Sequence, residues 1–296
     1  MTDGILNVLK PPGMTSHDVV RRVRRIYGTK KAGHSGTLDP DAAGVLPVFT
    51  GTATRLLAYA DTNRKQYRAE AVLGIRTDTG DDSGKVTERK PVPNLTKEEM
   101  KQVLRPFIGK IYQVPPMYSA LKVRGKKLYE YARQGIEMER KARPIEIFKL
   151  DLVYFDSPYF CLDITCSKGT YIRTLLEDIA SSAGTCACMT FLLRTKAGVF
   201  TIEDALAPEE IERQPETALL PLESAVSEIP ALSVNELQAF RITSGVKTTI
   251  AGTRPGIYRL YYGCRFLGMV TVENEIVSPD KILFQVPRPA GIDNCE

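Results

Sequence analysis

Apolar and polar side chains follow two different periods along the first part of the chain. Between Ser16 and Tyr27 apolar residues recur at helical spacing, and Thr15 or Ser16 can cap the helix that this spacing predicts. The arginines of this segment lie mostly off the apolar stripe. Residues 67–74 instead alternate apolar with polar side chains, which predicts a strand with Tyr67 on its apolar face.

The middle of the chain continues this mixture of periods. Thr96 and Glu99 have the spacing of a capping box, and the apolar stripe that follows predicts a helix ending near Gly109. A second apolar stripe predicts a helix over 170–182, with Gly184 beyond its end. Strand patterns between these two helices cover 145–155 and 159–166. Helices and strands interspersed in this way favour an α+β fold.

Three segments break both periods. Residues 33–51 are rich in glycine, proline and small side chains, which predicts a long shaped loop of the kind that carries functional groups. Residues 122–143 are polar and basic and are interpreted as an insertion, and 208–230 form an acidic connector. Short strand-like runs follow at 247–250, 257–262, 266–272 and 282–286. We therefore expect a large domain over 1–228 and a small barrel-like one over 229–296.

The composition is that of an ordinary globular protein. Its 296 residues are 43% hydrophobic, which is enough for a large and a small core. Runs of about eighteen apolar residues are missing and the N-terminus does not resemble a signal peptide, so we expect no membrane insertion and a cytoplasmic location. The cysteines have no C-x-x-C spacing. Reduced, mostly buried thiols are expected at Cys161, Cys166, Cys186, Cys188, Cys264 and Cys295.

The net charge of +5 is unevenly distributed along the chain. Residues 16–35 carry six basic side chains against one acidic, and residues 121–150 carry nine against four, so the remainder is acidic. A surface that holds a polyanion would produce this pattern, and so would two solvated helix faces. From charge alone the solvated faces are the simpler interpretation.

Candidate chemistry lies within 33–51. Asp39 precedes Pro40, which biases the aspartate away from helical geometry and can fix its carboxylate at one angle. An aspartate before a proline is more often a turn residue, so this signal needs support from elsewhere in the chain. A metal site is not expected, because His17 and His34 are the only two histidines and no metal-ligand spacing occurs.

That support comes from sequence blocks that follow one another along the chain. The blocks are KPPGMTS (10–16), GHSGTLDP (33–40), GVLPV (44–48), K-x-Y (65–67), PPMYSALKVRGKKLYEYAR (115–133), CSKGTYIRTLLEDI (166–179), FLLRT (191–195) and LLPLE (219–223). Together they resemble the bacterial tRNA pseudouridine synthase B (TruB) family from residue 4 to about residue 225. Several long blocks in order are far more specific than a single short motif.

The resemblance implies a catalytic domain on a mixed or antiparallel sheet, with no cofactor and no metal, that converts the T-loop uridine at tRNA position 55 to pseudouridine. The expected partner is the T-arm stem-loop of tRNA, with no obligate protein partner. The reaction breaks a C–N glycosidic bond, turns the uracil and rejoins it through carbon, so it needs no redox group. Asp39 matches the catalytic aspartate, either as a nucleophile on the ribose or as the base that gives a glycal.

The same resemblance implies further site residues. Tyr67 matches the tyrosine that stacks on the target base and assists a late proton transfer. Arg173 matches an arginine that pairs with Asp39 and favours its ionised form. Tyr171 belongs to the same block as a substrate-binding residue, and Leu192 matches an apolar residue of the uracil pocket. Without the motifs, Tyr67 would be interpreted as a core tyrosine, Arg173 as an exposed arginine at a helix start and Leu192 as a core leucine.

His34 and Lys10 complete the implied binding site. His34 matches a histidine that fills the gap left by the flipped nucleotide, because a planar ring can stack in place of the lost base. A hydrogen-bonded loop histidine is its simpler interpretation. Lys10 is grouped with the substrate-binding residues, although we interpret its block, which includes Pro11, as mainly structural.

RNA-binding segments are also implied by the resemblance. The basic insertion matches an RNA-gripping thumb, and the C-terminal part resembles a PUA-type RNA-binding domain. The thumb residues expected to contact phosphates are Lys122, Arg124, Lys126 and Lys127. Departures from the family pattern are Ser35, Asp41 and Ala43, where Thr, Leu and Thr are expected. Asp41 adds a negative charge near the RNA, but none of the three removes a catalytic residue.

Two other functions fit the sequence less well than a synthase does. A non-catalytic tRNA-binding or folding protein would need the basic surfaces but not Asp39, Tyr67 and Arg173 together, and all three are present. An RNA methyltransferase is not favoured, because no glycine-rich nucleotide-binding motif follows an N-terminal strand.

Overall fold

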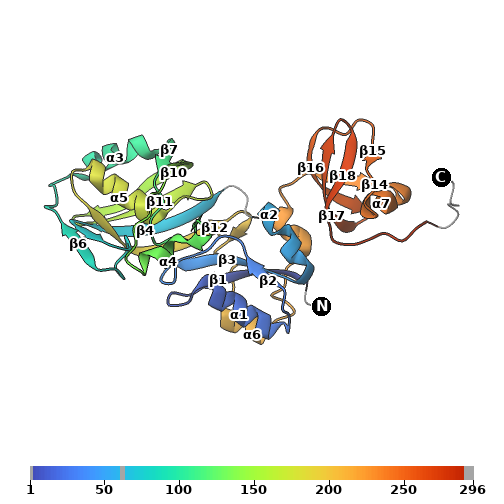
Figure 1. Ribbon diagram of the computed structural model, residues 1–296, viewed down its shortest axis with the longest axis horizontal. Coiled ribbons are helices and arrows are strands. Elements are labelled where there is room, and N and C mark those ends of the chain that lie inside the picture. Colours follow the sequence, from blue (N-terminus) through green and yellow to red (C-terminus); the bar gives the residue numbers. More distant parts are fainter. Residues whose placement is uncertain (1–2, 61–63, 290–296) are drawn as a thin grey trace.

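The computed structural model describes residues 3–60 and 64–289, which form two β-rich bodies side by side in an elongated molecule (Figure 1). The first body is built on a nine-stranded sheet and the second on a five-stranded sheet. Helices are interspersed among the strands throughout. The expected α+β fold class is confirmed.

The large sheet is mixed. Its strand order is β1-β3-β12-β4-β11-β10-β7, with β2 on β3 and β13 on β12, and all neighbours are antiparallel except β12 and β3. The strands are β1 (Gly4–Lys10), β2 (Ala32–His34), β3 (Ala43–Thr50), β4 (Lys65–Leu73), β7 (Gly109–Gln113), β10 (Arg143–Asp156), β11 (Tyr159–Cys166), β12 (Ala187–Ala197) and β13 (Phe200–Thr201). A separate hairpin joins β5 (Ile75–Thr77) to β6 (Val86–Arg89).

Two of the predicted helices, α1 and α3, begin at the caps that the sequence indicates. Thr15 caps α1, accepting a bond from the Asp18 amide at 3.0 Å while the Asp18 carboxylate bonds back to Thr15, and Thr96 with Glu99 caps α3 in the same way. Such reciprocal caps satisfy amides that the helix itself leaves unpaired. The helices are α1 (Ser16–Ile26), α2 (Leu57–Ala60), α3 (Lys97–Leu104), α4 (Leu128–Ala132), α5 (Ile172–Ser182), α6 (Pro208–Arg213) and α7 (Glu236–Thr243). Short 3₁₀ turns cover Gly51–Leu56, Arg105–Phe107 and Leu222–Val226.

Strand β4 lies in the middle of the large sheet and shows the predicted alternation. Tyr67, Ala69, Ala71 and Leu73 are all buried in one core cluster, against residues of α3 and α5. The intervening Arg68 and Glu70 are on the opposite face, where Arg68 pairs with Asp163 of β11 at 2.7 Å. A strand covered on one face produces this pattern of period two.

The prediction of a long loop over 33–51 is wrong at both ends of this range. Its first residues belong to β2, and Ala43–Thr50 is the long strand β3. Every residue of β3 after Ala43 is buried, because Leu46 and Val48 pack toward α1 while Val45 and Phe49 pack into the cluster on the other face. A strand covered on both faces shows no alternation, so its sequence does not look like a half-buried strand. The irregular segment shrinks to 35–42.

The second body is β-rich, as expected. Its strand order is β14-β16-β17-β18-β15, and α7 packs against it. The strands are β14 (Ala231–Val234), β15 (Thr248–Thr249), β16 (Gly256–Tyr262), β17 (Arg265–Glu273) and β18 (Ile276–Ile282). The strand expected at 282–286 is wrong, because β18 ends at Ile282. Neither β14 nor α7 was predicted from the sequence.

The two bodies are packed against each other. Phe266 and Met269 of β17 belong to the same apolar cluster as Phe49 and Leu56 of the first body. Polar contacts reinforce this, since Arg55 donates to the Ile282 carbonyl and the Tyr59 hydroxyl bonds to Asp280. The predicted domain boundary between residues 228 and 229 stays a prediction.

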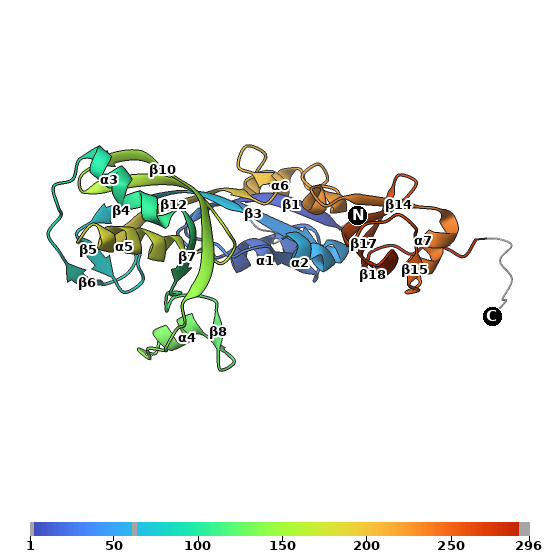
Figure 2. The ribbon, with the colours of Figure 1, turned by 90° about the horizontal axis from the view of Figure 1, so that it is seen from above.

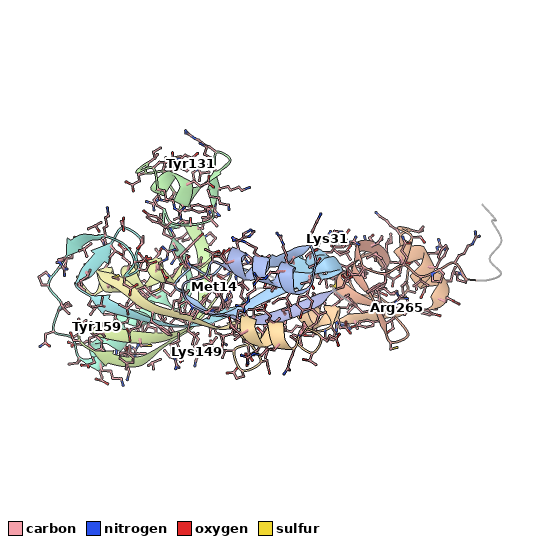
Figure 3. All side chains as sticks on the ribbon, turned by 90° about the horizontal axis from the view of Figure 1, so that it is seen from below. Met14, Lys31, Tyr131, Lys149, Tyr159 and Arg265 are labelled. Atoms are coloured by element: carbon pink, nitrogen blue, oxygen red, sulfur yellow. The ribbon has the colours of Figure 1, made fainter. Side chains whose placement is uncertain are left out.

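The basic insertion projects from the large sheet between β7 and β10 (Figure 2). It contains a two-residue hairpin, β8 (Lys122–Val123) with β9 (Lys126–Lys127), followed by α4. Seen from the opposite side, Tyr131 lies in this projection, well away from the sheet (Figure 3). We keep the name thumb for residues 122–143.

Two further expectations were that the cysteines are mostly buried and that no segment inserts into a membrane. Free cysteines at 161, 166, 186 and 188 are buried, as expected, whereas Cys264 is exposed. Cys295 lies outside the described residues. Among the helices of residues 3–60 and 64–289, none has both the length and the apolar character needed to cross a membrane.

Candidate active site

Lys10 at the end of β1 holds the loop that carries Asp39. Its side chain is fully buried, and the ammonium donates to three backbone carbonyls, those of Pro11 at 2.8 Å, Met14 at 2.6 Å and Pro40 at 2.8 Å. Burial lowers the pKa of Lys10 to about 8, while the nearby Asp41 and Asp39 carboxylates oppose the shift. Lys10 therefore positions the loop beside Asp39, and its donors leave none for a substrate. This agrees with the structural interpretation of its block.

Ser16, the first residue of α1, holds the same loop from a second direction. Its buried hydroxyl donates to the Leu38 carbonyl at 3.0 Å and accepts from the Leu38 amide at 2.9 Å. The Ser16 hydroxyl thus pairs with both the amide and the carbonyl of Leu38, the residue before Asp39. Irregular backbone can be buried only when its polar groups find such partners.

Arg194 on β12 holds the start of the loop. It is completely buried, and its guanidinium donates to the Val45 carbonyl at 2.7 Å and to the Gly36 carbonyl at 2.9 Å. The backbone of β3 approaches it so closely that a Cβ added at Gly44 would lie 2.2 Å from the Arg194 carbonyl oxygen. Gly44 also has a φ of +116°, so a side chain there would be strained as well.

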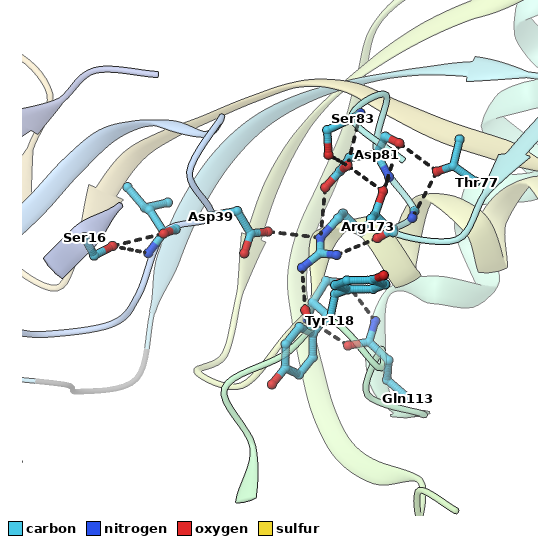
Figure 4. Close-up of polar contacts among 12 residues, drawn as sticks. Ser16, Asp39, Thr77, Asp81, Ser83, Gln113, Tyr118 and Arg173 are labelled. Atoms are coloured by element: carbon cyan, nitrogen blue, oxygen red, sulfur yellow. Dashed lines mark hydrogen bonds and ion pairs between the residues drawn. The ribbon is translucent and has the colours of Figure 1, made fainter. Parts of the chain in front are cut away.

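Asp39 forms an ion pair with Arg173 of α5, as the resemblance implies (Figure 4). The Arg173 Nε lies 3.0 Å from one Asp39 oxygen and 3.7 Å from an oxygen of Asp81. Its other nitrogens donate to the carbonyls of Thr79 at 2.5 Å and Tyr118 at 2.9 Å. The Arg173 side chain is 6% exposed and that of Asp39 is 38% exposed, so a rigid guanidinium presents an accessible carboxylate.

Tyr67 and Leu192 lie beside this carboxylate on neighbouring strands. Both are buried, and both line the cavity into which Asp39 opens. Burial raises the pKa of the Tyr67 phenol, and the Arg194 guanidinium opposes that shift. The phenol is therefore neutral in the resting protein and has a cation nearby.

Tyr171 is fixed by Gln113 of β7. The Gln113 side chain accepts from the Tyr171 amide at 2.8 Å and donates to its carbonyl at 3.1 Å, at the residue that precedes α5. Tyr171 is thereby held in the lining of the cavity, two residues before Arg173. Burial raises the pKa of its hydroxyl.

The cavity has a volume of about 240 Å³, below the range of about 300–1,000 Å³ that is typical of small-molecule pockets. Five of the seven expected site residues line it. They are Asp39, Tyr67, Tyr171, Arg173 and Leu192. Lys10 does not line it, and neither does His34, which ends β2 opposite Val48. The structure therefore brings the three implied catalytic residues together around one small space.

The thumb is connected directly to this space. Tyr118, Ser119 and Ala120, which precede the thumb, form one wall of the cavity. The four expected phosphate-contact residues lie farther out; Lys122, Arg124 and Lys126 are exposed and Lys127 is partly exposed. A movement of the thumb would therefore also move this wall of the cavity.

Four residues of the site were not predicted from the sequence. Asp81 lies in the acidic turn after β5, and Lys65 lines the cavity beside Tyr67. Ser16 and Arg194 support the loop from outside. The sequence blocks contain all of these residues except Asp81, but a block does not show which of its members face the same point. Within residues 3–60 and 64–289, no group of three or more His, Cys, Asp or Glu side chains could hold a metal ion.

Comparison with known proteins agrees with the geometry. The family model described as TruB family pseudouridylate synthase (N terminal domain) matches residues 24–172. The tRNA pseudouridine synthase B of Caldanaerobacter subterraneus subsp. tengcongensis is 45% identical over 285 residues, 95% of this chain and 99% of that protein. That of Moorella thermoacetica is 49% identical over 254 residues, 83% of each chain. That of Hydrogenovibrio crunogenus is 41% identical over 295 residues, 99% of this chain and 97% of the relative.

Solved structures share the fold at lower sequence identity. One, described as an H/ACA RNP bound to a substrate RNA containing 2'-deoxyuridine, aligns with a TM-score of 0.74 and 22% identity over 95% of this chain and 85% of its own. A Cbf5-Nop10-Gar1 complex aligns with a TM-score of 0.74 and 24% identity over 96% and 86% of the two chains. These likenesses concern the fold, including the β-rich C-terminal part, which is consistent with a PUA-like domain. From the family model and the identity to its relatives, the chain belongs to the TruB family of pseudouridylate synthases.

Proposed function

We propose that this pseudouridine synthase converts the T-loop uridine at position 55 of tRNA to pseudouridine, with Asp39 as its catalytic carboxylate. The observation that carries the proposal is the Asp39 carboxylate, held 3.0 Å from Arg173 and open to a cavity lined by Tyr67 and Leu192. The relatives named tRNA pseudouridine synthase B support tRNA as the substrate. A small cavity suits one uracil ring better than a larger ligand.

The geometry suits a reaction that separates and rejoins one base and one ribose. Arg173 favours the ionised form of Asp39, because a guanidinium at ion-pair distance stabilises a carboxylate. That carboxylate can attack the ribose as a nucleophile, or remove a ribose proton to give a glycal. In either route the uracil turns within the cavity between Tyr67 and Leu192 and reattaches through C5. Substrate and product contain the same atoms, so the reaction needs no cofactor and no metal.

The target uridine must leave the folded T loop before it can reach Asp39. Extruding a base costs a few kcal/mol of stacking and pairing, and His34 is the proposed side chain that fills the gap. The thumb would hold the T arm through Lys122, Arg124, Lys126 and Lys127. In this proposal the catalytic domain covers 1–228, the RNA-binding PUA-like domain covers 229–296, no protein partner is obligatory, and the enzyme acts in the cytoplasm.

The direct test is to map pseudouridine in a tRNA transcript incubated with the purified protein. The expected product is pseudouridine at position 55 only, and a transcript with cytidine at that position should stay unmodified. Release of tritium from uracil C5 measures the rate. A protein that binds this tRNA tightly but yields no pseudouridine would instead be a tRNA-binding or folding protein.

A further inference from the structure

Arg194 is a buried cation that supports the loop but has no part in the chemical steps described so far. It is among the largest fully buried side chains and does not line the cavity. Within residues 3–60 and 64–289, no carboxylate pairs with it. Two of its nitrogens bond to the carbonyls of Val45 and Gly36, whereas Nη1 is buried without a hydrogen-bond partner of ordinary geometry in the same residues. A desolvated guanidinium without an anion is unfavourable unless a neighbour develops negative charge.

Tyr67 is that neighbour. Arg194 and Tyr67 are direct partners across the β12 and β4 pair, and both side chains are buried in the same region of the sheet. The other titratable groups that face the Tyr67 hydroxyl are Cys166 of β11 and Asp39 of the loop, and Lys65 of β4 lines the same cavity. Arg194 is the cation that opposes the effect of burial on the pKa of Tyr67. A guanidinium has only donors, so it can stabilise a phenolate oxygen.

Building on the proposed function, we propose that Arg194 is a positioning residue that stabilises negative charge on the Tyr67 oxygen while that oxygen removes the proton from uracil C5. In this proposal Asp39 and Arg173 act in the cleavage of the glycosidic bond. Tyr67, supported by Arg194, acts in the proton transfer that ends the reaction. The two tasks are thus divided between two buried arginines, Arg173 of α5 and Arg194 of β12. Arg194 touches no substrate atom and acts through Tyr67.

The step balances with water as the only other reactant. After C5 has joined the ribose, C5 still carries its hydrogen and the ring has a C6=N1 double bond. The phenolic proton of Tyr67 first passes to water, which leaves a phenolate oxygen beside Arg194. The C5–H bond then breaks, and its proton goes to that oxygen. The C5–H electron pair forms the C5=C6 double bond, and the displaced C6=N1 pair stays on N1, which takes a proton from water. The enzyme is unchanged, and the C5 hydrogen has left to solvent.

The test compares Arg194→Met, Arg194→Lys and Tyr67→Phe on tRNA with hydrogen or deuterium at C5 of the target uridine. Arg194→Met should lower kcat by about 10- to 100-fold, with KM within about twofold, because a proton-transfer step loses part of its catalysis. Its deuterium isotope effect should exceed that of the wild type, since proton removal becomes rate-limiting. Arg194→Lys keeps a cation beside the phenol and should recover part of the rate. The double variant Arg194→Met with Tyr67→Phe should have nearly the same kcat as Tyr67→Phe alone.

The opposite results assign Arg194 to loop support alone. A loop that has merely shifted slows cleavage of the glycosidic bond, so the isotope effect would stay at the wild-type value and Arg194→Met would slow the Tyr67→Phe enzyme by its full factor. Unfolding of both Arg194 variants, measured by circular dichroism, would also overturn the proposal and make the residue part of the core. Failure of the proposed function is distinguished by the wild-type enzyme, which would then form no pseudouridine on the same tRNA.

Discussion

The loop that carries Asp39 (35–42) and the thumb (122–143) are both irregular and polar, yet they are held in opposite ways. The loop is bound by buried donors from β1, α1 and β12, namely Lys10, Ser16 and Arg194. In the thumb, every residue of which the structure describes, Leu128 is the one buried residue, and backbone bonds such as Leu128 to Leu121 and Tyr129 to Ser119 keep it folded locally. Most of its charged side chains are exposed to solvent.

This difference shows two uses of charge in one molecule. A desolvated ammonium or guanidinium that is hydrogen-bonded to backbone carbonyls fixes the backbone around it, because breaking any of these bonds leaves an unpaired polar group in the interior. A solvated cation fixes little in its own chain but remains available to neutralise a phosphate. We therefore expect substitutions in the loop to change turnover and substitutions in the thumb to change RNA affinity.

The largest effect should follow Asp39→Asn. The amide keeps the size of the side chain but removes the charge that makes it a nucleophile or a base, so turnover should fall by about 10⁴-fold or more. Binding of tRNA should change by less than about twofold, because phosphate contacts dominate it. Tritium release and a filter-binding titration on one tRNA measure both. The matched control is the exposed neighbour Asp41→Asn, which should keep most of the activity, and substantial product from a pure Asp39→Asn enzyme would contradict the role of Asp39.

Lys10→Met should have the next largest effect, together with a characteristic pH dependence. Losing the bond to Pro40 lets the loop shift, which should cost about 10- to 100-fold in kcat at pH 7. The pKa of wild-type Lys10 is lowered to about 8, so its ammonium keeps three donors below that pH and loses one donor and its charge above it. The wild-type rate should therefore decline above about pH 8, and the ratio of wild type to Lys10→Met should shrink. Single-turnover rates from about pH 6 to about pH 9.5 test this, and a constant ratio would exclude it.

Neutralising the thumb should weaken binding more than chemistry. Changing Lys122, Arg124, Lys126 and Lys127 to Gln should reduce the slope of log Kd against log salt by about 0.7–0.9 for each phosphate that the thumb no longer neutralises, with kcat at saturating tRNA nearly unchanged. The matched control changes four exposed lysines outside the thumb: Lys85, Lys97, Lys101 and Lys149. That control should leave the slope unchanged. Equal slopes for the thumb variant and the wild type would place the thumb outside the RNA interface.

The smallest effect should follow Ser16→Ala, which removes both bonds to the Leu38 backbone. Leaving a buried amide and carbonyl unpaired should lower the free energy of unfolding by about 1–3 kcal/mol, and kcat should fall by about three- to tenfold as the loop loosens. Thr15→Ala removes the neighbouring helix cap and should also cost about 1 kcal/mol, but without a change in kcat. If both variants lose stability and neither loses rate, Ser16 stabilises α1 and does not position Asp39.

Local patterns in the sequence predicted the elements that have one covered face. The alternation from Tyr67 to Leu73, the cap at Thr15 or Ser16 and the capping box at Thr96 depend on neighbours along the chain, and all three appear in the structure. Strand β3 was missed because its two covered faces remove the alternation, and β18 was displaced because its polar residues Ser278, Asp280 and Lys281 hide the strand pattern. Where the period is lost, the sequence does not show which faces are covered.

The sequence by itself predicted the α+β class and, through ordered blocks that resemble one family, implied that Arg173 pairs with Asp39, since such blocks identify chemistry that local physics cannot. Only the tertiary structure decided which block members share one point in space. It placed Lys10 under the loop instead of in the cavity, brought Asp81 to Arg173, and put Arg194 across from Tyr67. Sheet register and burial set these relations, because they join residues that are far apart in the chain and leave no local pattern in it.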